Sequence, residues 1–119
     1  MNLETFYEYC LSKKGVSEHF PFDEDTLVFK VGGKMFALSS LSQWEKNEQS
    51  VNLKCDPDRA QELRAEYDEI QPGYHMSKVH WNTIALNGNL ADKFVKELID
   101  HSYELVFKSL TKKIQSEII

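Results

Sequence analysis

Apolar residues recur at helical spacing close to both ends of the chain. Near the N-terminus they mark one face of a helix that Asn2 can cap, and the set is Leu3, Phe6, Tyr7, Cys10 and Leu11. Gly15 follows and suits the left-handed conformation in which many helices end. The pattern therefore predicts a short amphipathic helix at the start of the chain.

The longest apolar stripe lies near the C-terminus and predicts a helix over residues 90–110. Its apolar face is broad and consists of Phe94, Val95, Leu98, Ile99, Ser102, Leu105, Val106 and Leu110. Asn89 can cap this helix, with Asp92 at its third position. At 1.5 Å per residue such a helix spans about 30 Å, the width of a small domain. The mixed tail after it, residues 111–119, is expected to fray.

Two β-rich runs between these helices flank Gly32-Gly33, a signal for a hairpin with a two-residue turn. An unbroken ladder from this turn gives three cross-strand pairs: Val31 with Lys34, Phe29 with Phe36, and Leu27 with Leu38. The predicted core side of the hairpin then holds Leu27, Phe29, Phe36 and Leu38. Its other side holds Val28, Lys30, Met35 and Ala37. That second side is not fully polar, which leaves open that another segment covers it.

The middle of the chain predicts a loop, a strand and a helix in turn. Residues 41–50 form a polar loop around Trp44, and residues 51–55 alternate as a third strand. Asp56-Pro57 is a strong helix start, because aspartate caps and proline occupies the first helical position. Pro72-Gly73 is expected to stop this helix. Residues 74–86 then predict one or two strands, as a hairpin or a bent pair.

The element order is α-β-β-β-α-β-β-α over a single domain, residues 1–119. A hairpin followed directly by a third strand favours an antiparallel sheet with helices packed on one face, an α+β fold. Hydrophobic residues make up 41% of the chain, which excludes a disordered protein. No basic leader and no apolar run of about 18 residues is present, so we expect a cytoplasmic protein without a membrane partner.

Residue types with catalytic or ligand-binding chemistry are present, but not in patterns that define a site. His75 and His80 lie outside any zinc motif, and no phosphate-binding glycine loop occurs. Cys10 and Cys55 fall at apolar-periodic positions, where buried free thiols are expected. The acidic run at residues 23–25 could hold a cation, although a solvated loop is the simpler interpretation. We therefore predict no catalytic residues, no cofactor and no enzyme activity.

The most distinctive stretch is a polar and aromatic block between Pro72 and Leu86. It combines stacking surfaces with hydrogen-bond donors, in Tyr74, His75, Lys78, His80, Trp81 and Asn82. Such a set could bind a base, a peptide or a small polar ligand. The alternative, which we favour, is that Tyr74 and Trp81 belong to the scaffold. Lys78, His80 and Asn82 are then the side chains expected to touch a partner.

Several segments together resemble the MmcQ/YjbR family of small bacterial proteins. The matching motifs are Phe20-Pro21-Phe22, residues 26–38, residues 51–57, Pro72-Gly73-Tyr74-His75-Met76, His80-Trp81-Asn82-Thr83 and residues 98–103. They cover nearly the whole chain, in order and with plausible spacing. The resemblance implies a cytosolic bacterial protein with a CyaY-like fold, and this agrees with the element order read from the pattern.

The same resemblance implies a non-enzymatic DNA-binding protein of the double-wing type. The side chains available to phosphates or bases are Lys30, Lys34, Lys54, Arg59, Lys78, His80, Trp81 and Asn82. Lys34 lies at a hairpin tip, as a wing requires. Phosphate neutralisation supplies most nucleic-acid affinity, and the chain has a net charge of −5. We therefore expect weak, salt-sensitive binding by a monomer.

Two other functions remain open. The partly apolar second side of the hairpin favours a protein- or peptide-binding module, which resembles the secretion-chaperone type of α/β fold. By fold analogy alone, the resemblance to frataxin-like proteins implies metal handling, with Asp23, Glu24 and Asp25 as candidate ligands.

Overall fold

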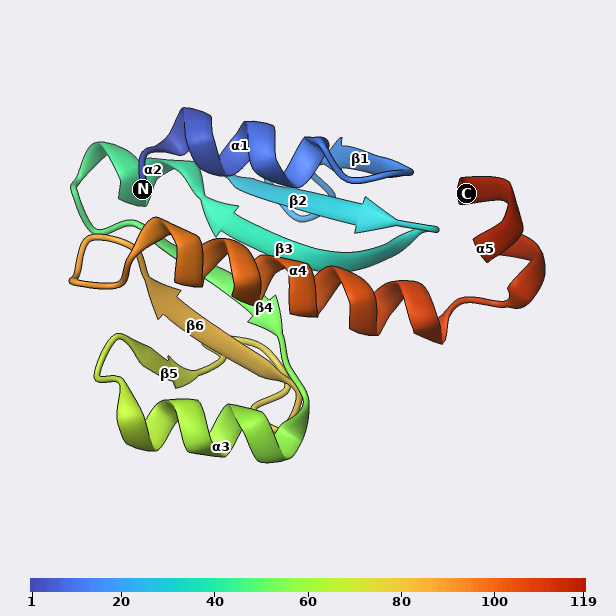
Figure 1. Cartoon of the computed structure of the whole chain (residues 1–119). Coiled ribbons are helices and arrows are strands. Elements are labelled where there is room, and N and C mark those ends of the chain that lie inside the picture. The colour runs from blue at the N-terminus through green and yellow to red at the C-terminus, as the bar shows by residue number, and fades with distance from the viewer.

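Six strands form one antiparallel sheet in a computed structural model that describes residues 1–119 (Figure 1). The strands are β1 (Val16–His19), β2 (Thr26–Val31), β3 (Lys34–Ser40), β4 (Ser50–Lys54), β5 (Ile70–Pro72) and β6 (Trp81–Ala85). The helices are α1 (Leu3–Leu11), α2 (Leu41–Glu45), α3 (Pro57–Glu66), α4 (Asp92–Ser109) and α5 (Lys112–Ile118). The strand order across the sheet is β1-β2-β3-β4-β6-β5.

Helices α1, α3 and α4 cover one face of the sheet, which we call the inner face (Figure 1). Phe6 of α1, Leu63 of α3 and Ile99 of α4 are buried in one main core with the inward side chains of the strands. Phe29 and Phe36 lie at its centre, where Phe29 meets the Phe6 ring edge-on. The predicted α+β fold, with an antiparallel sheet and helices on one face, is confirmed.

A β-bulge changes the predicted register of the central hairpin. Gly32 and Gly33 have positive φ angles and form the predicted turn, and Val31 pairs with Lys34 as expected. The ladder then shifts by one residue, so that Phe29 pairs with Ala37 rather than Phe36. The other pairs follow the shift: Leu27 pairs with Ser39, and Val28 with Leu38.

The bulge corrects the predicted faces of β3. Phe36 and Ala37 both enter the main core, although Ala37 was expected on the opposite side. Leu38 lies on the outer face beside Val28, although it was expected in the main core. The physical reason is the period of two in a strand, because one extra residue moves every later side chain to the other face.

A serine of α4 bridges β3 and β4 beside the bulge, where the pairing of these two strands ends. The Ser102 hydroxyl donates to the Phe36 carbonyl at 2.5 Å and accepts from the Lys54 backbone N–H at 2.9 Å. Ser102 is fully buried. One side chain thus satisfies two buried backbone groups on neighbouring strands, and it ties α4 to the middle of the sheet.

The predicted helix starts at Asn2 and Asp56 are correct, whereas the predicted end of the second of these helices is not. Asn2 caps α1 and Asp56 caps α3, as predicted. Gly15 has the expected left-handed conformation, four residues beyond the end of α1. Helix α3, however, ends at Glu66, well before Pro72-Gly73, because Tyr67 is already extended. Ile70, predicted on that helix, instead begins β5.

The C-terminal part contains two further corrections. Helix α4 begins at Asp92 after Ala91, so Asn89 is not its cap. The tail predicted to fray forms α5, which Thr111 caps by accepting the N–H of Ile114. Ile114 and Ile118, one helical turn apart, pack against the main core. Burial of these two side chains explains why the tail is ordered.

Strand β1 and helix α2 are absent from the sequence-based prediction. Three of the four residues of β1 are exposed, so it has no alternating pattern to detect. Helix α2 has five residues and none of them is buried. Both sheet edges are short, since β5 contains three residues and ends at Pro72. No helix combines the length and the apolar character that crossing a membrane requires.

Candidate functional site

Residues 73–80 connect β5 to β6 and lie over the outer face of the sheet. Met76 from this connection and Trp81 after it pack on Val28, Leu38 and Met35, which form a small second core. The second side of the hairpin is therefore covered by another segment, a possibility that the sequence left open. The exposed patch that motivated a protein-binding module on that side is absent.

Arg64 of α3 holds this connection in place. Its Nε donates to Asn82 Oδ1 at 2.7 Å, and its terminal nitrogen donates to the carbonyls of Lys78 at 2.5 Å and Trp81 at 3.1 Å. Lys78 closes the connection on itself, because its Nζ donates to the Gly73 carbonyl at 2.9 Å. A planar guanidinium suits such a set of three acceptors. Arg64 and Lys78 thereby fix the start of β6.

Gly73 allows the connection to approach the sheet. A Cβ added there would stand 2.8 Å from Trp81 Cβ and 3.0 Å from the Trp81 carbonyl oxygen. The Gly73 N–H donates to that carbonyl at 2.8 Å. A larger residue would push the connection away from β6.

The outer face also carries the largest cavity near this connection, which we call the outer groove. Its volume is about 620 Å³. The floor comes from β3, β4 and β6 through Leu38, Ser40, Ser50, Asn52 and Thr83. Its walls are the segment before β2, with Phe22 and Asp23, and the segment after β5, with Tyr74, His75 and Met76. Cavities of this size are typical of small-molecule sites.

The wall after β5 is anchored to the floor by hydrogen bonds. The Tyr74 backbone N–H donates to Thr83 Oγ1 at 2.9 Å, and the Thr83 hydroxyl in turn donates to Asn52 Oδ1. His75 has a φ of 58°, which is uncommon for a residue with a side chain. The rings of Tyr74 and His75 lie 4.0 Å apart between centroids. Tyr74, expected to be scaffold, is 68% exposed.

The opposite wall is built by two aspartates. Asp23 accepts the N–H groups of Asp25 and Thr26, and Asp25 accepts the Ser40 and Ser42 hydroxyls and the Ser42 N–H. These hydrogen bonds hold the pKa of both carboxyls below the usual range. Both carboxylates are thus committed to the loop. No three histidine, cysteine or acidic side chains converge into a metal-binding group anywhere in residues 1–119.

Lysines gather at the end of the sheet where the β2–β3 hairpin turns. Gly32 at this turn lies against Leu110 and Ile114, which places the end of α4 and the start of α5 beside the hairpin. Five of the lysines there are exposed and Lys30 is half-buried, and we call the set the basic end: Lys14, Lys30, Lys34, Lys108, Lys112 and Lys113. Glu117 is the one carboxylate in segments 12–15, 30–34 and 108–118.

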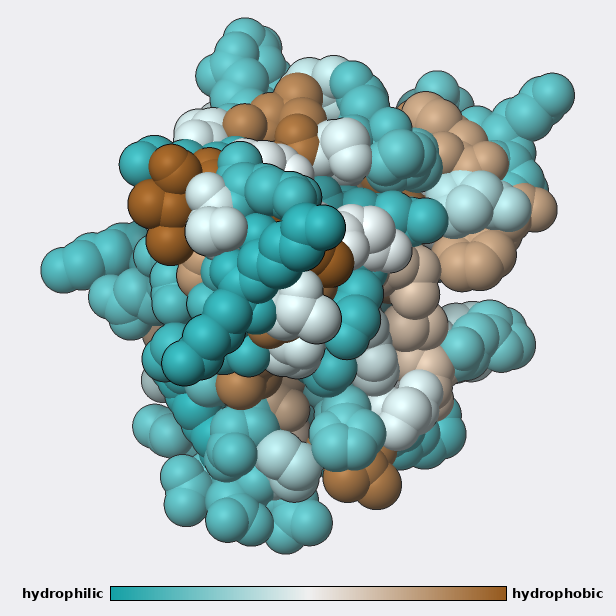
Figure 2. Space-filling view, turned by 90° about the vertical axis from the view of Figure 1, so that its right-hand side faces the viewer, coloured by the Kyte–Doolittle hydropathy of each residue, from teal (hydrophilic) through white to brown (hydrophobic).

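Figure 2 looks onto this end of the molecule. Hydrophilic residues dominate the view, several long side chains reach into solvent, and the apolar patches between them are small. The exposed lysines of the basic end therefore belong to a mainly hydrophilic surface.

The opposite end of the sheet is acidic. Hydrogen bonds join its loops, since Leu41 donates to Asp25, Leu86 to Gln49, and Asn89 to Glu69. The carboxylates of these loops and of the helix ends beside them are Asp23, Glu24, Asp25, Glu45, Glu48, Asp68, Glu69 and Asp92, and the lysines there are Lys46 and Lys93. The net charge of −5 thus hides a strong separation of charge along the molecule.

The structure brings together only part of the residue set predicted from the sequence. Lys30 and Lys34 belong to the basic end, and Lys54 projects from the outer face where β4 ends. Arg59 is half-buried in the first turn of α3, and His80 is exposed next to Lys78. Trp81 and Asn82 are 8% and 2% exposed, so they face the interior and have structural contacts.

Both cysteines are free and buried, as predicted. Burial raises the pKa of the Cys10 thiol to about 12, and burial also raises the pKa of Cys55. Neither thiol is therefore a thiolate at neutral pH, and a thiolate is the form that acts as a nucleophile.

His101 links α4 to the start of α3. Its Nε2 accepts the Asp56 backbone N–H at 3.2 Å, which requires the neutral ring. Burial, assisted by the charge of Arg59, lowers the pKa of His101 below its usual value. His101 therefore has a structural contact, and its ring is neutral while it accepts the Asp56 N–H.

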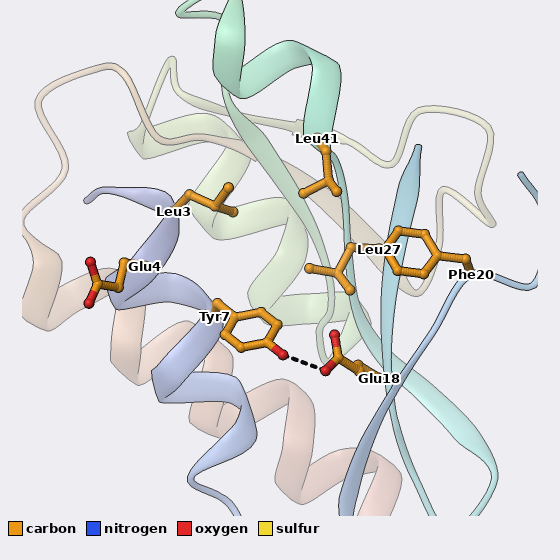
Figure 3. Close-up of a pocket in the computed structure, with 7 residues that line it drawn as sticks. All are labelled: Leu3, Glu4, Tyr7, Glu18, Phe20, Leu27 and Leu41. Carbon is orange, nitrogen blue, oxygen red and sulfur yellow. Dashed lines mark hydrogen bonds between the residues drawn. The ribbon is translucent and has the colours of Figure 1, made fainter. Parts of the chain in front are cut away.

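A second cavity of about 510 Å³ lies between α1 and the strands β1 and β2 (Figure 3). Leu3, Tyr7 and Leu27 line it with Phe20 and Leu41, and the Tyr7 hydroxyl donates to Glu18. This hydrogen bond raises the pKa of Tyr7. The cavity is open and almost entirely apolar, so it offers few groups that could orient a ligand.

Sequence reasoning missed two contributors to these surfaces. Lys112 and Lys113 lie on the unpredicted helix α5, although Thr111 as a cap and the spacing of Ile114 and Ile118 could have indicated it. Phe22 was noted only within a motif, and it is 63% exposed beside the turn that Asp23 closes.

Comparison with known proteins identifies close relatives over the whole chain. The sequence model of the YjbR family matches residues 11–105. The chain is 34% identical over 115 residues to uncharacterized protein YbdF of Escherichia coli O157:H7. This alignment covers 97% of this chain and 92% of that protein. It is 31% identical over 104 residues to uncharacterized protein YjbR of Escherichia coli K12, covering 87% and 86% respectively.

Solved structures give the same assignment. The crystal structure of Deinococcus radiodurans protein DR2400, described as a DUF419 domain, has a TM-score of 0.90 and 37% identity, covering 98% of this chain and 87% of that one. A crystal structure from Pseudomonas syringae has a TM-score of 0.76 and 29% identity, covering 89% and 99%. By sequence and by fold, the chain belongs to the YjbR family.

Proposed function

We propose that the protein is a non-enzymatic binding protein that holds the DNA backbone at its basic end. The observation that carries this proposal is the separation of charge, because lysines concentrate at the hairpin turn while carboxylates concentrate at the opposite end. A chain of net charge −5 can approach a polyanion only through such a local surface.

The arrangement of the lysines supports backbone contact rather than base recognition. Lys34 follows the turn of the β2–β3 hairpin, and this turn packs against the junction of α4 and α5, which places Lys112 and Lys113 of α5 near it. Lysine is a flexible point charge that meets phosphates without selecting a sequence. Trp81 and Asn82, the two residues best suited to contact bases, are buried. We expect binding that is weak, salt-dependent and almost independent of sequence.

The competing functions have less support. A chaperone-like role on the second side of the hairpin lacks an exposed apolar patch, because Met76 and Trp81 cover it. Frataxin-like metal handling by residues 23–25 has only Glu24 without a hydrogen bond, because the carboxylates of Asp23 and Asp25 accept hydrogen bonds from residues 25, 26 and 42.

The test is a titration of labelled duplex DNA with the protein, followed by fluorescence anisotropy at low and moderate salt. We expect binding near 50 mM salt that weakens steeply as salt is raised. The double variant Lys112→Glu/Lys113→Glu should bind at least tenfold more weakly, and the slope of its salt dependence should fall by about 0.9 for each phosphate that the protein no longer neutralises. The matched control is Lys46→Glu/Lys93→Glu, which changes the net charge by the same amount but reverses two exposed lysines at the acidic end.

Two results would overturn the proposal. One is the absence of binding even near 50 mM salt, where phosphate contacts are strongest. The other is equal loss of affinity in the control and in the α5 variant, which would mean that net charge rather than the basic end governs association.

A further inference from the structure

We propose that the outer groove is a second binding site, for an uncharged planar heterocyclic ring of the nucleobase class. The groove lies near the acidic end and contains no lysine or arginine among its lining residues. The proposal therefore does not rest on DNA binding at the basic end.

Aromatic side chains stand on the two opposite walls of the groove. Phe22 lies before β2 and is 63% exposed, and Tyr74 lies after β5 and is 68% exposed. In the sheet, β3, β4 and β6 separate β2 from β5, so the two rings border the groove from opposite sides. Phe22 makes no ring contact with another aromatic side chain, and Tyr74 contacts only the neighbouring His75 ring, so both rings keep surface in solvent that could stack on a planar ligand.

Hydrogen bonds within the protein hold the backbone segments that carry these two rings. The Asp23 turn fixes the segment that carries Phe22, and the hydrogen bond from the Tyr74 N–H to Thr83 fixes the other wall. His75 adopts a left-handed conformation next to Tyr74. Non-glycine residues in this region are disfavoured, and they concentrate at ligand sites. The site is thus preformed, which limits the entropy lost on binding.

The floor offers hydrogen-bond donors that the protein does not use. Asn52 of β4 and Gln43 of α2 both line the groove. Asn52 Oδ1 accepts the Thr83 hydroxyl, and Gln43 Oε1 accepts the Ser50 hydroxyl. The amide nitrogens of these two residues make no hydrogen bond within the protein. Nucleobases present ring nitrogens and carbonyl oxygens at their edges, which match such donors. A ligand that only stacked would leave these amide groups unpaired.

Charge selects against other ligands. Asp23 is the one carboxylate in the lining, its pKa is held low by the loop N–H groups, and no lysine or arginine lines the groove to balance it. A phosphate or carboxylate group inside the groove would therefore be repelled. An extended peptide would lack backbone partners, since the strands of the floor already pair with one another. A neutral ring with acceptors at its edge suits the aromatic walls, the free amide donors and the lack of lysine or arginine in the groove.

The test is a titration of the intact protein with the common ribonucleosides, which carry no phosphate, monitored by amide chemical shifts in solution NMR. We expect saturable shifts, at millimolar nucleoside or below, that are confined to residues 22–26, 39–43, 50–52, 74–76 and 83. Free ribose and glucose serve as probes that keep the hydroxyls and lack the base.

Variants on the exposed walls separate ligand contacts from folding. Phe22→Ala and Tyr74→Ala should each weaken nucleoside binding by about tenfold to hundredfold, because each removes a stacking surface. Gln43→Glu keeps the shape and the acceptor for Ser50 but removes the free donor, and it should also weaken binding. Phe20→Ala is the matched control, since Phe20 is 45% exposed and lines the cavity beside α1 instead.

A second arm distinguishes a free nucleoside from a base within a strand. Short single-stranded oligonucleotides that bind more tightly than nucleosides, with shifts at both the groove and Lys34, would identify a strand as the source. Equal affinities would identify the free nucleoside. In either arm Lys112→Glu/Lys113→Glu must leave nucleoside binding unchanged, which keeps failure of the basic end apart from failure of the groove.

Three outcomes would overturn the inference. They are the absence of saturable shifts with every nucleoside, equal shifts with ribose or glucose, and shifts that persist unchanged in both Phe22→Ala and Tyr74→Ala.

Discussion

The two faces of the sheet are completed by different means. Three helices cover the inner face and bury one continuous core that includes Phe6, Phe29 and Ile99. On the outer face a single connection covers three buried residues, Val28, Leu38 and Trp81, and beyond it the surface opens into the outer groove. Polar anchors replace apolar area there, chiefly the hydrogen bonds of Arg64 and Lys78. Most of the buried apolar surface therefore lies on the inner face, and the outer face keeps an open groove.

The largest expected effect tests whether the inner face dominates stability. Phe36→Ala should lower the free energy of unfolding by about 3–5 kcal/mol, because it leaves a cavity at the centre of the main core. Denaturant unfolding monitored by circular dichroism measures this loss. Phe22→Ala, on the exposed outer wall, should change the same quantity by less than about 0.5 kcal/mol. Comparable losses in the two variants would break the contrast between the faces.

A smaller effect tests the bridge between the bulge and α4. Ser102→Ala should lower the free energy of unfolding by about 1–3 kcal/mol, because the Phe36 carbonyl and the Lys54 N–H both lose their partner in the interior. Ser109→Ala is the control, since that hydroxyl only bonds back to the carbonyl of Val106 in its own helix. If both alanine variants unfold at the same denaturant concentration, the bridge has no energetic role.

Removing the anchor of the outer connection should act locally. Arg64→Met keeps much of the side-chain volume but loses three hydrogen bonds, and we expect a loss of about 1–2 kcal/mol. Amide hydrogen exchange should rise in residues 73–82 while α4 keeps its protection. Arg64→Lys should rescue little, because a lysine lacks the planar array of donors. Uniform loss of protection would show that the two faces unfold as one unit.

The smallest effect concerns pH. The folded state lowers the pKa of His101, so below about pH 6.5 the unfolded chain binds more protons than the folded one. Stability should therefore fall as pH drops from about 6.5 toward the folded pKa, with a slope below the ~1.4 kcal/mol per pH unit of one full proton. His101→Gln should flatten this part of the profile. An unchanged slope in the variant would assign the dependence to other groups.

Sequence reasoning succeeded where a local rule had no competitor. The caps at Asn2 and Asp56, the turn at Gly32-Gly33 and the burial of both cysteines follow from short-range chemistry. It failed at Leu38 because the ladder between β2 and β3 shifts by one residue, and no residue in the hairpin marks that bulge in the sequence. The end of α3 was misplaced for a similar reason, since Ile70 continues the helical spacing but pairs with Ile84 in the sheet.

The candidate surfaces were harder to predict than the fold. Lys30 and Lys34 were found because a hairpin displays its own side chains. The contribution of α5 depends on Ile114 packing against Gly32, a contact that no local pattern encodes. The outer groove requires Phe22 and Tyr74 to be brought together from segments about 50 residues apart. Spacing along the chain therefore identified the ingredients of the polar-aromatic block without indicating which of them face solvent.

The two edge strands of the sheet, β1 and β5, affect whether copies of the protein can associate by strand pairing. An unpaired strand is a template onto which another chain can add, and repeated addition produces aggregates. Strand β5 offers three residues before Pro72, which has no N–H to donate, and β1 offers four. Short, interrupted borders of this kind disfavour the addition of a seventh strand. The outer groove opens on the face of the sheet, so these edges can be blunted without closing it.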